Sequence, residues 1–319
     1  MAGLLLHPLR PAPGRAALLF AALLSAAAFS PAHPGTGIVV DAAGCVYFTD
    51  LRQIWRWEPG GRLTAIVSDK HSHGLLLDAD GSVMGEHLAF EPASKRWLTS
   101  AWRWTREGLT QVLPPSEGFP PSLPQAVGPD GSAYFCKVDN NRRDVSEIWR
   151  RGRDGSLELL AGGAYGYADG QGRSARFGGI GALAVGPDGA LYVADAPAIR
   201  RVAPDGRVST LARGGLLKPS FAYRVFGGRF GYLMGLAVDG SGNVFVANYG
   251  GGKVVKVTPA AVMTTVVASP GSWSPSGVAI ARGELYVLEY RAAPAALSPS
   301  VRVRRVSERG RVETLAKVP

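Results

Sequence analysis

One pattern recurs six times along the chain and restricts the possible fold more than any other feature. Each copy is a short apolar stretch, a turn with glycine, and a second apolar stretch that ends in a polar residue six positions after the glycine. The turn glycines are Gly44, Gly81, Gly131, Gly189, Gly242 and Gly283. The polar residues that follow them are Asp50, His87, Lys137, Asp195, Asn248 and Glu289. Consecutive copies lie 37 to 58 residues apart, a spacing typical of propeller blades.

Two more amphipathic stretches around a second turn follow each copy, such as Gln53–Trp57 and Arg62–Val67 in the first unit. Each unit therefore predicts four β-strands. Such a unit cannot bury both of its faces alone, so neighbouring units must stack and the ring must close. The sequence predicts an all-β fold, a six-bladed β-propeller of four-stranded antiparallel blades. Closure is expected from packing of the sixth blade against the first, without a shared blade.

The first 32 residues have a different character. Arg10 and Arg15 precede the uncharged, apolar run Ala16–Phe29, and small residues follow it. A bilayer-spanning helix needs about 20 residues, so this run fits a signal peptide better than a membrane anchor. We predict a signal peptide over residues 1–32, with an uncleaved anchor as the alternative, and a single propeller domain over residues 33–319. The protein is then secreted or periplasmic.

The remaining composition restricts partners and redox chemistry. The formal net charge is +10, but the basic residues are dispersed, which favours a soluble surface over one that binds acidic polymers or anionic lipids. No aromatic and basic stacking platform is evident, so we do not expect nucleic acid as a partner. The two cysteines, Cys45 and Cys136, fall two blades apart, which predicts two free thiols. We expect a monomer.

Residues 164–214 closely resemble an NHL repeat, through the segments ADGQGRSARFGG, ALAVGPDGALYVAD and IRRVAPDGRVSTLA. The other five units resemble it less closely, and together they cover the chain after the predicted signal peptide. The same pattern is similar to the gluconolactonase-type and regucalcin-type propellers. That resemblance implies calcium-dependent lactone hydrolysis, with carboxylate and amide ligands at the axial starts of several first strands. The residues at those positions here are Thr36, His73, Leu123, Gly181, Met234 and Ser276, none of them Asp, Glu or Asn.

Strand alternation assigns the loops to two faces. The turns within each hairpin are short, whereas the connections after the second strands and between blades are long. We call the face with these long connections the top face. Its segments are His87–Ser100, Pro114–Leu123, Val138–Val145, Ala161–Ile180, Ala212–Met234 and Glu289–Ser300. Loops on a rigid scaffold commonly carry function, so the top face is the predicted binding surface.

Histidine offers a second kind of site. Folding the second unit about its turn places His73 opposite His87, with Glu86 beside it and His71 two residues earlier. Three histidines could hold Zn²⁺ with one open position for water. The peptide-amidating lyases, which are similar to NHL propellers, use a histidine-bound metal near the axis. All three histidines here come from one blade, so we expect no cofactor, with Zn²⁺ or Ca²⁺ as the alternative.

The function predicted from these features is an exported binding scaffold, whose partner is a protein, a peptide or an acidic envelope polymer such as a glycan. The candidate ligand-binding residues are Thr36, Asp50, His73, His87, Lys137, Asp195, Met234, Asn248, Glu289, Arg142 and Arg229. An aspartate that ends such a strand usually braces a turn, so Asp50 and Asp195 are also expected to be structural. The alternative is a metal-dependent hydrolase or lyase, lactonase-like or peptide-lyase-like, at the axial mouth. No catalytic residue is assigned.

Overall fold

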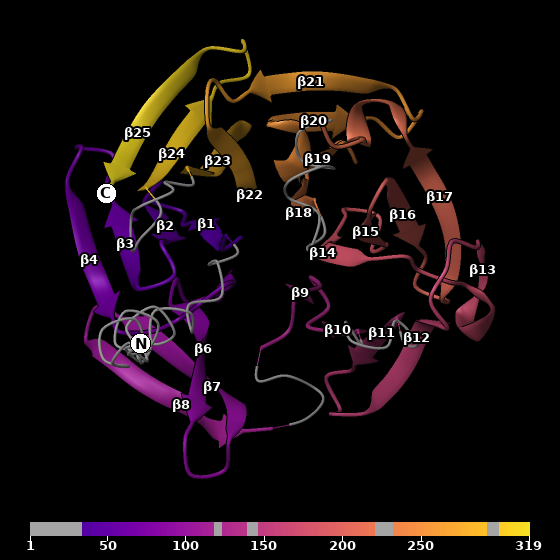
Figure 1. Cartoon of the computed structure of the whole chain (residues 1–319), viewed down its shortest axis with the longest axis horizontal. Helices are drawn as coiled ribbons and strands as arrows, with labels where there is room; N and C mark the ends of the chain where they lie inside the picture. The colour runs from indigo at the N-terminus through magenta and orange to yellow at the C-terminus, as the bar shows by residue number, and fades with distance from the viewer. Residues whose placement is uncertain (1–33, 118–122, 139–145, 221–231, 292–299) are drawn as a thin grey trace, which may run out of the picture. The chain divides into compact units, whose positions relative to one another are not determined.

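The computed structural model describes residues 34–117, 123–138, 146–220, 232–291 and 300–319. The compact unit Pro34–Pro319 is a six-bladed β-propeller, in which each blade is an antiparallel sheet made from consecutive strands (Figure 1). The predicted fold is therefore confirmed. No helix within these described ranges is long and apolar enough to cross a membrane.

The first three blades hold twelve strands. They are β1 (Ile38–Val40), β2 (Val46–Thr49), β3 (Gln53–Trp57) and β4 (Leu63–Ser68) in blade 1; β5 (Leu75–Leu77), β6 (Val83–Glu91), β7 (Arg96–Thr105) and β8 (Gly108–Ser116) in blade 2; and β9 (Ala126–Val127), β10 (Ala133–Val138), β11 (Ser146–Arg151) and β12 (Leu157–Gly163) in blade 3.

The last three blades hold the other thirteen. They are β13 (Gly170–Gln171), β14 (Ile180–Val185), β15 (Leu191–Asp195), β16 (Ala198–Val202) and β17 (Arg207–Arg213) in blade 4; β18 (Leu233–Val238), β19 (Val244–Asn248), β20 (Lys253–Val257) and β21 (Met263–Ala268) in blade 5; and β22 (Trp273–Ala281), β23 (Glu284–Arg291), β24 (Ser300–Val306) and β25 (Val312–Val318) in blade 6. The described helices are single 3-10 turns, η1 (Gly172–Ser174), η2 (Gly215–Leu217) and η3 (Tyr249–Gly251).

The six turn glycines explain why the repeat is visible in the sequence. Each adopts a positive φ between 71° and 87° at the turn that joins the first strand of its blade to the second. Glycine reaches this left-handed conformation without steric penalty, so it marks the turn in every blade. The second strand then starts one or two residues after the glycine in each blade, so the residue six positions after the glycine lies at or near the end of that strand in most blades.

Two parts of the top face differ from the expectation of long loops. In blade 2, β6 and β7 continue as a paired hairpin from His87↔Ser100 to Glu91↔Arg96, so His87–Ser100 is not a loop. In blade 4, the segment Ala161–Ile180 contributes β13, a fifth strand that pairs with β17. Most of Val138–Val145, and the central parts of the connections around 114–123, 212–234 and 289–300, fall outside the described residues.

Apolar clusters between blades form the core. Within the described residues, five of the six junctions have such a cluster, and the junction between blades 2 and 3 has none. The cluster between blades 6 and 1 includes Phe48 and Leu288, both fully buried. No sheet in the described chain combines strands from both ends, so the ring closes by packing between blades 6 and 1. Both cysteines are free, as predicted.

Candidate functional site

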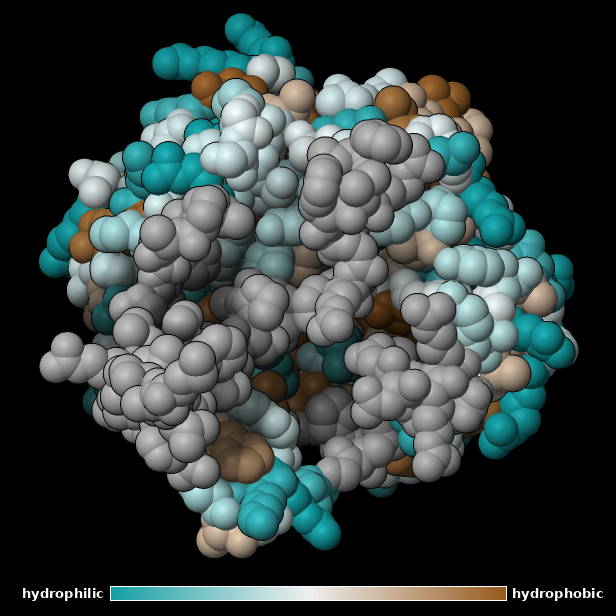
Figure 2. Space-filling model, viewed as in Figure 1, coloured by the Kyte–Doolittle hydropathy of each residue, from teal (hydrophilic) through white to brown (hydrophobic). Residues whose placement is uncertain are grey.

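A cavity of about 310 Å³ lies on the propeller axis, where the innermost strands of all six blades converge. Figure 2 shows a hollow at the centre of the face turned toward the viewer, with both hydrophobic and hydrophilic residues at its bottom. The residues around it are Thr36, Gly37, Ile38, His73, Gly74, Leu75, Leu76, Glu86, Leu123, Pro124, Gln125, Gly181, Ala182, Leu183, Gly235, Leu236 and Val278. Its size suits a small molecule.

Glycine allows the inner strands to approach one another around the cavity. A Cβ on Gly235 would lie 2.7 Å from the Cα of Gly277 in the next blade. A Cβ on Gly277 would lie 2.3 Å from the backbone oxygen of Thr36, across the junction that closes the ring. These contacts leave no room for side chains, so backbone forms much of the wall.

Three histidines and one glutamate from blade 2 lie together at this wall. The Nε2 atoms of His71 and His73 are 3.0 Å apart, so one of them donates a hydrogen bond to the other. The His73 Nδ1 lies 3.7 Å from Oε1 of Glu86. The backbone N–H of His71 donates to Nδ1 of His87 at 3.0 Å. His73 and Glu86 line the cavity, whereas His71 and His87 do not.

The position of Glu86 is fixed by its backbone. Its carbonyl accepts hydrogen bonds from Nε1 of Trp102, at 3.0 Å, and from the hydroxyl of Ser72. Trp102 is buried and its ring lies over Gly85, where an added Cβ would be 2.0 Å from the ring. Gly85 thus makes space for the indole that holds the neighbouring Glu86 in place.

The surroundings of His87 favour the neutral form of its imidazole ring. Burial, and to a lesser degree the nearby charge of Lys70, lowers the pKa of His87 below 6.5. Nδ1 of His87 accepts a hydrogen bond from the backbone N–H of His71, so it carries no proton. The neutral ring therefore has its proton on Nε2. The fixed tautomer of His87 therefore restrains the backbone of His71, and through it the pair with His73.

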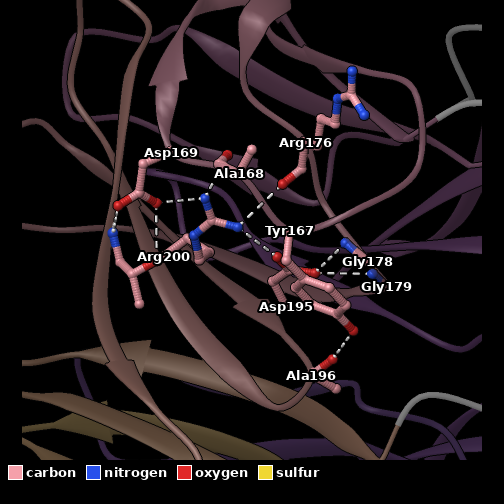
Figure 3. A network of polar contacts seen from close by, with 10 residues as sticks. Tyr167, Ala168, Asp169, Arg176, Gly178, Gly179, Asp195, Ala196 and Arg200 are labelled. Atoms are coloured by element: carbon pink, nitrogen blue, oxygen red, sulfur yellow. Dashed lines mark hydrogen bonds and ion pairs between the residues drawn. The ribbon is translucent and has the colours of Figure 1, made fainter.

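Other predicted ligand residues instead brace the blades. Asp195 is fully buried and accepts hydrogen bonds from the N–H groups of Gly178 and Gly179, at 2.7 and 2.8 Å, and from Arg200, at 2.9 Å (Figure 3). Arg200 also pairs with Asp169 at 2.7 Å. This network ties the loop before β14 to β15 and β16. Asp195 thus has the structural role that its strand-end position suggested, and its ligand role stays a prediction.

Asp50, Asn248 and Glu289 are similar cases. Asp50 accepts from the N–H groups of Arg52 and Gln53 and from the indole of Trp55, so it closes the turn between β2 and β3. Asn248 is fully buried and caps η3 by accepting from Gly251 at 2.8 Å.

Glu289 is fully buried and pairs with Arg302 and Arg304 of β24. The side-chain oxygens of Glu289, like those of Asp50 and Asn248, contact partners within the protein, and the ligand role of these three residues stays a prediction. None of the three lines the axial cavity.

The remaining candidates are spread over the face. Thr36 lines the cavity, and its hydroxyl and N–H both contact the carbonyl of His73. Lys137 is exposed on β10 opposite Glu147, and Met234 is half-buried on β18; neither lines the cavity. Arg142 and Arg229 lie outside the described residues.

The side chains of the described residues do not fit either implied metal. Calcium takes six to eight oxygen ligands, and among the described residues that line the cavity Glu86 is the only carboxylate. The amide oxygen of Gln125 already accepts from the N–H of Cys136, at 2.9 Å. Zinc would need convergent ligands, but no group of three or more His, Cys, Asp or Glu is arranged for a metal in these ranges. The three histidines bond to one another instead.

This geometry defines the class of the molecule as a six-bladed propeller with a small axial cavity beside a His–Glu pair. Residues 34–290 match the family described as the SMP-30/Gluconolactonase/LRE-like region, and the chain belongs to this family. The similarity to gluconolactonase-type and regucalcin-type propellers that the sequence suggested is therefore confirmed.

Solved structures share the fold at low sequence identity. A gluconolactonase from Xanthomonas campestris has a TM-score of 0.55 and 16% identity, over 79% of this chain and 81% of its own. Regucalcin from Agrobacterium tumefaciens, a calcium-binding protein, has a TM-score of 0.53 and 14% identity, over 84% and 85%. A streptogramin B lyase has a TM-score of 0.50 and 14% identity, over 89% and 83%. No curated protein sequence matches the chain.

In the structure His73 lies beside Glu86, whereas His87 contacts His71. Sequence reasoning did not include Gln125, which lines the cavity. The first strand of blade 3, β9, has only two residues, so its start carries little signal in the sequence. The preceding Pro124 and the turn glycine Gly131 were the available markers. Gln125 reaches the cavity because β9 pairs with β10 and contacts β14 of the next blade.

Proposed function

We propose that this protein is an enzyme that hydrolyses a small cyclic ester in its axial cavity. The observation that carries the proposal is the His73–Glu86 pair, because these two ionisable side chains line the cavity next to each other. Membership of a family that includes gluconolactonases supports an enzyme over a scaffold. The sequence-based alternative of a hydrolase is thus preferred, but without the metal that it assumed.

The chemistry assigns a role to each residue. The Glu86 carboxylate accepts a proton from a water molecule as the water oxygen attacks the ester carbonyl. When the ring C–O bond breaks, that proton passes to the leaving alkoxide oxygen, and a hydroxy acid results. If Nε2 of His73 accepts the hydrogen bond from His71, Nδ1 of His73 carries its proton toward Glu86. His73 then orients the carboxylate and supports its negative charge.

The test is turnover of simple lactones by the purified protein, followed by release of the hydroxy acid. Glu86→Gln keeps the shape of the side chain but removes the base, and we expect kcat to fall by about 10²–10⁴-fold. Glu91→Gln is the matched control, because Glu91 is exposed on the same strand, away from the cavity. Equal rates for both variants and the original chain would refute the proposal.

A binding scaffold on the top face stays a prediction. The central parts of its loops fall outside the described residues, and four of the polar residues that end the second strands, Asp50, Asp195, Asn248 and Glu289, are engaged in internal contacts. Export to the periplasm or the medium likewise stays a prediction. A pull-down from envelope extracts that captures one protein or glycan, combined with no lactone turnover, would favour the scaffold.

A further inference from the structure

A cluster of arginines in blade 6 carries more positive charge than its neighbours neutralise. Arg291 ends β23, and Arg302 and Arg304 lie on the paired strand β24, at the end of the blade that belongs to the top face. Glu289 pairs with Arg302 and Arg304, whereas Arg291 forms no ion pair within the described residues. Three guanidinium groups therefore share one carboxylate.

Trp273 of β22 holds two of these guanidinium groups close to each other. The centroid of its ring lies 4.3 Å from Cζ of Arg302 and 5.2 Å from Cζ of Arg291. Trp273 and Arg291 are partners in the pairing of β22 with β23, which fixes this arrangement. Arg291 also donates a hydrogen bond to the hydroxyl of Ser300, at 3.2 Å. Two like charges are thus kept beside one ring, although they repel each other.

The two arginines of β24 are buried deeply enough that water solvates them poorly. The side chain of Arg302 is 13% exposed and that of Arg304 is 9% exposed. Nη2 of Arg302 and Nε of Arg304 are buried and donate no hydrogen bond. Buried polar groups nearly always have a partner, because an unpaired donor costs free energy. The cluster therefore lacks both negative charge and hydrogen-bond acceptors.

The sequence supplies no second carboxylate side chain at this end of blades 5 and 6. From residue 207 to the end of the chain, the acidic residues are Asp239, Glu284, Glu289, Glu308 and Glu313. All except Glu289 lie at or next to the turns between β18 and β19, between β22 and β23 or between β24 and β25, at the opposite end of the blades. Segments 221–231 and 292–299, outside the described residues, contain no Asp or Glu. The excess charge is therefore available to an external anion.

We propose that Arg291, Arg302 and Trp273 form a binding site for an oxyanion, the carboxylate or phosphate group of an acidic ligand. A guanidinium group presents two parallel N–H groups, which match two oxygens of either anion. Arg291 is only half-buried, so the ligand reaches the cluster from the top face. None of the three residues lines the axial cavity, so the site does not depend on the proposed lactone hydrolysis.

Binding of two simple anions at constant ionic strength tests the proposal. The probes are inorganic phosphate and malonate, titrated by calorimetry, with NaCl added to keep the ionic strength equal. We expect saturable binding of at least one probe, and a higher thermal midpoint in its presence than in NaCl alone. Binding of phosphate alone would identify a phosphate group as the ligand, and binding of malonate alone a carboxylate. No saturable binding of either anion would overturn the proposal.

A pair of arginine variants locates the bound anion. Arg291→Gln removes a guanidinium group that pairs with no described carboxylate, and we expect affinity to fall by about 10- to 100-fold, as for loss of a hydrogen bond to a charged group. Arg305→Gln is the matched control, because Arg305 is a half-buried arginine of β24 that pairs with Glu284 and Glu313. We expect its affinity to be unchanged. An equal loss in both variants would contradict the assigned site.

The thermal midpoint gives a readout that a merely structural arginine cluster would not change. We expect the anion to raise the midpoint of the original chain and of Arg305→Gln, but to raise that of Arg291→Gln much less. Arg291→Lys keeps the charge without the planar group, so its affinity should lie between those of Arg291→Gln and the original chain. If the anion stabilised Arg291→Gln as much as the original chain, it would bind elsewhere and the proposal would fail.

Discussion

The hydroxyl of Tyr290 in β23 donates a 2.8 Å hydrogen bond to the backbone carbonyl of Thr49 in β2, and both residues are buried. The bond joins the last blade to the first and lies beside the apolar cluster of that junction. Burial raises the pKa of the phenol well above 10, so the hydroxyl remains a donor throughout the ordinary pH range.

Tyr290→Phe should weaken the closure of the ring. The substitution leaves the ring packing intact but removes the donor to a buried carbonyl, which typically costs about 1–3 kcal/mol. We expect the free energy of unfolding, measured by urea titration, to fall by that amount. Tyr165→Phe is the control because Tyr165 is 40% exposed, and it should change little. An equal effect at both positions would show that the closing bond has no special role.

Asp195→Asn should be among the most damaging single substitutions in blade 4. It removes the charge that pairs with Arg200, whose side chain is only 2% exposed. Breaking one side of a buried ion pair costs about 3–5 kcal/mol of folding free energy. Asp188→Asn breaks the pair with Arg201, where both side chains are more than a third exposed, and should cost less than about 1 kcal/mol. Denaturant unfolding of the two variants distinguishes these outcomes.

Stability should fall in mildly acidic solution because of His87. Its pKa is lowered in the folded protein, so the unfolded chain takes up the proton first as the pH falls. The contribution is fully present above the unfolded pKa of about 6.5 and is lost as the pH falls from there through the folded pKa. Urea unfolding between pH 8 and pH 5 should show the loss, and His87→Gln should reduce it. If the dependence of the unfolding free energy on pH were the same in His87→Gln, another group would be the cause of the acid sensitivity.

Gly85→Ala should displace Glu86. The new methyl group would overlap the Trp102 ring, which in turn holds the Glu86 carbonyl. Overpacking of this kind costs about 1–3 kcal/mol. We expect a lower free energy of unfolding and slower lactone turnover together. Gly240→Ala is the control, since a Cβ there meets no atom within 4 Å and φ is not in the left-handed region.

Removal of metal ions should leave the protein unchanged. The part of the axial wall that the structure describes offers one carboxylate, and the histidines of blade 2 are hydrogen-bonded to one another. We therefore expect the same thermal midpoint and the same turnover with and without a chelator. A lower midpoint after chelation, restored by Ca²⁺ or Zn²⁺, would show that residues beyond the described ranges complete a metal site.

The blades could be predicted because their signals are local. A positive-φ glycine at each turn and alternating apolar residues on each side are enough to define a hairpin, and β3 spans the predicted Gln53–Trp57. β13 could not be predicted, because Gly170 and Gln171 have no apolar alternation and pair only with β17. The β6–β7 extension was hidden for a related reason, since Pro92 and Lys95 at its tip are typical of a loop.

The candidate site was predictable only within one blade. The turn in blade 2 pairs β5 with β6 from Leu77↔Val83 to Leu75↔Gly85, so the residues just beyond, His73 and Glu86, meet for a reason that the sequence shows. The shape of the cavity depends on how six inner strands approach one another, and no local pattern in the sequence reports that approach. The brace formed by Asp195 also needs Arg200 and the loop at Gly178, which are brought together only by the folded blade.

The way in which the ring closes has a thermal consequence. A propeller whose first and last strands share one sheet is held by a ladder of backbone hydrogen bonds, whereas here Phe48, Leu288 and their neighbours supply most of the contact. The attraction between apolar surfaces weakens on cooling. The joint between blades 6 and 1 should therefore be firmest at moderate temperature and loosen in the cold, where a shared sheet would not.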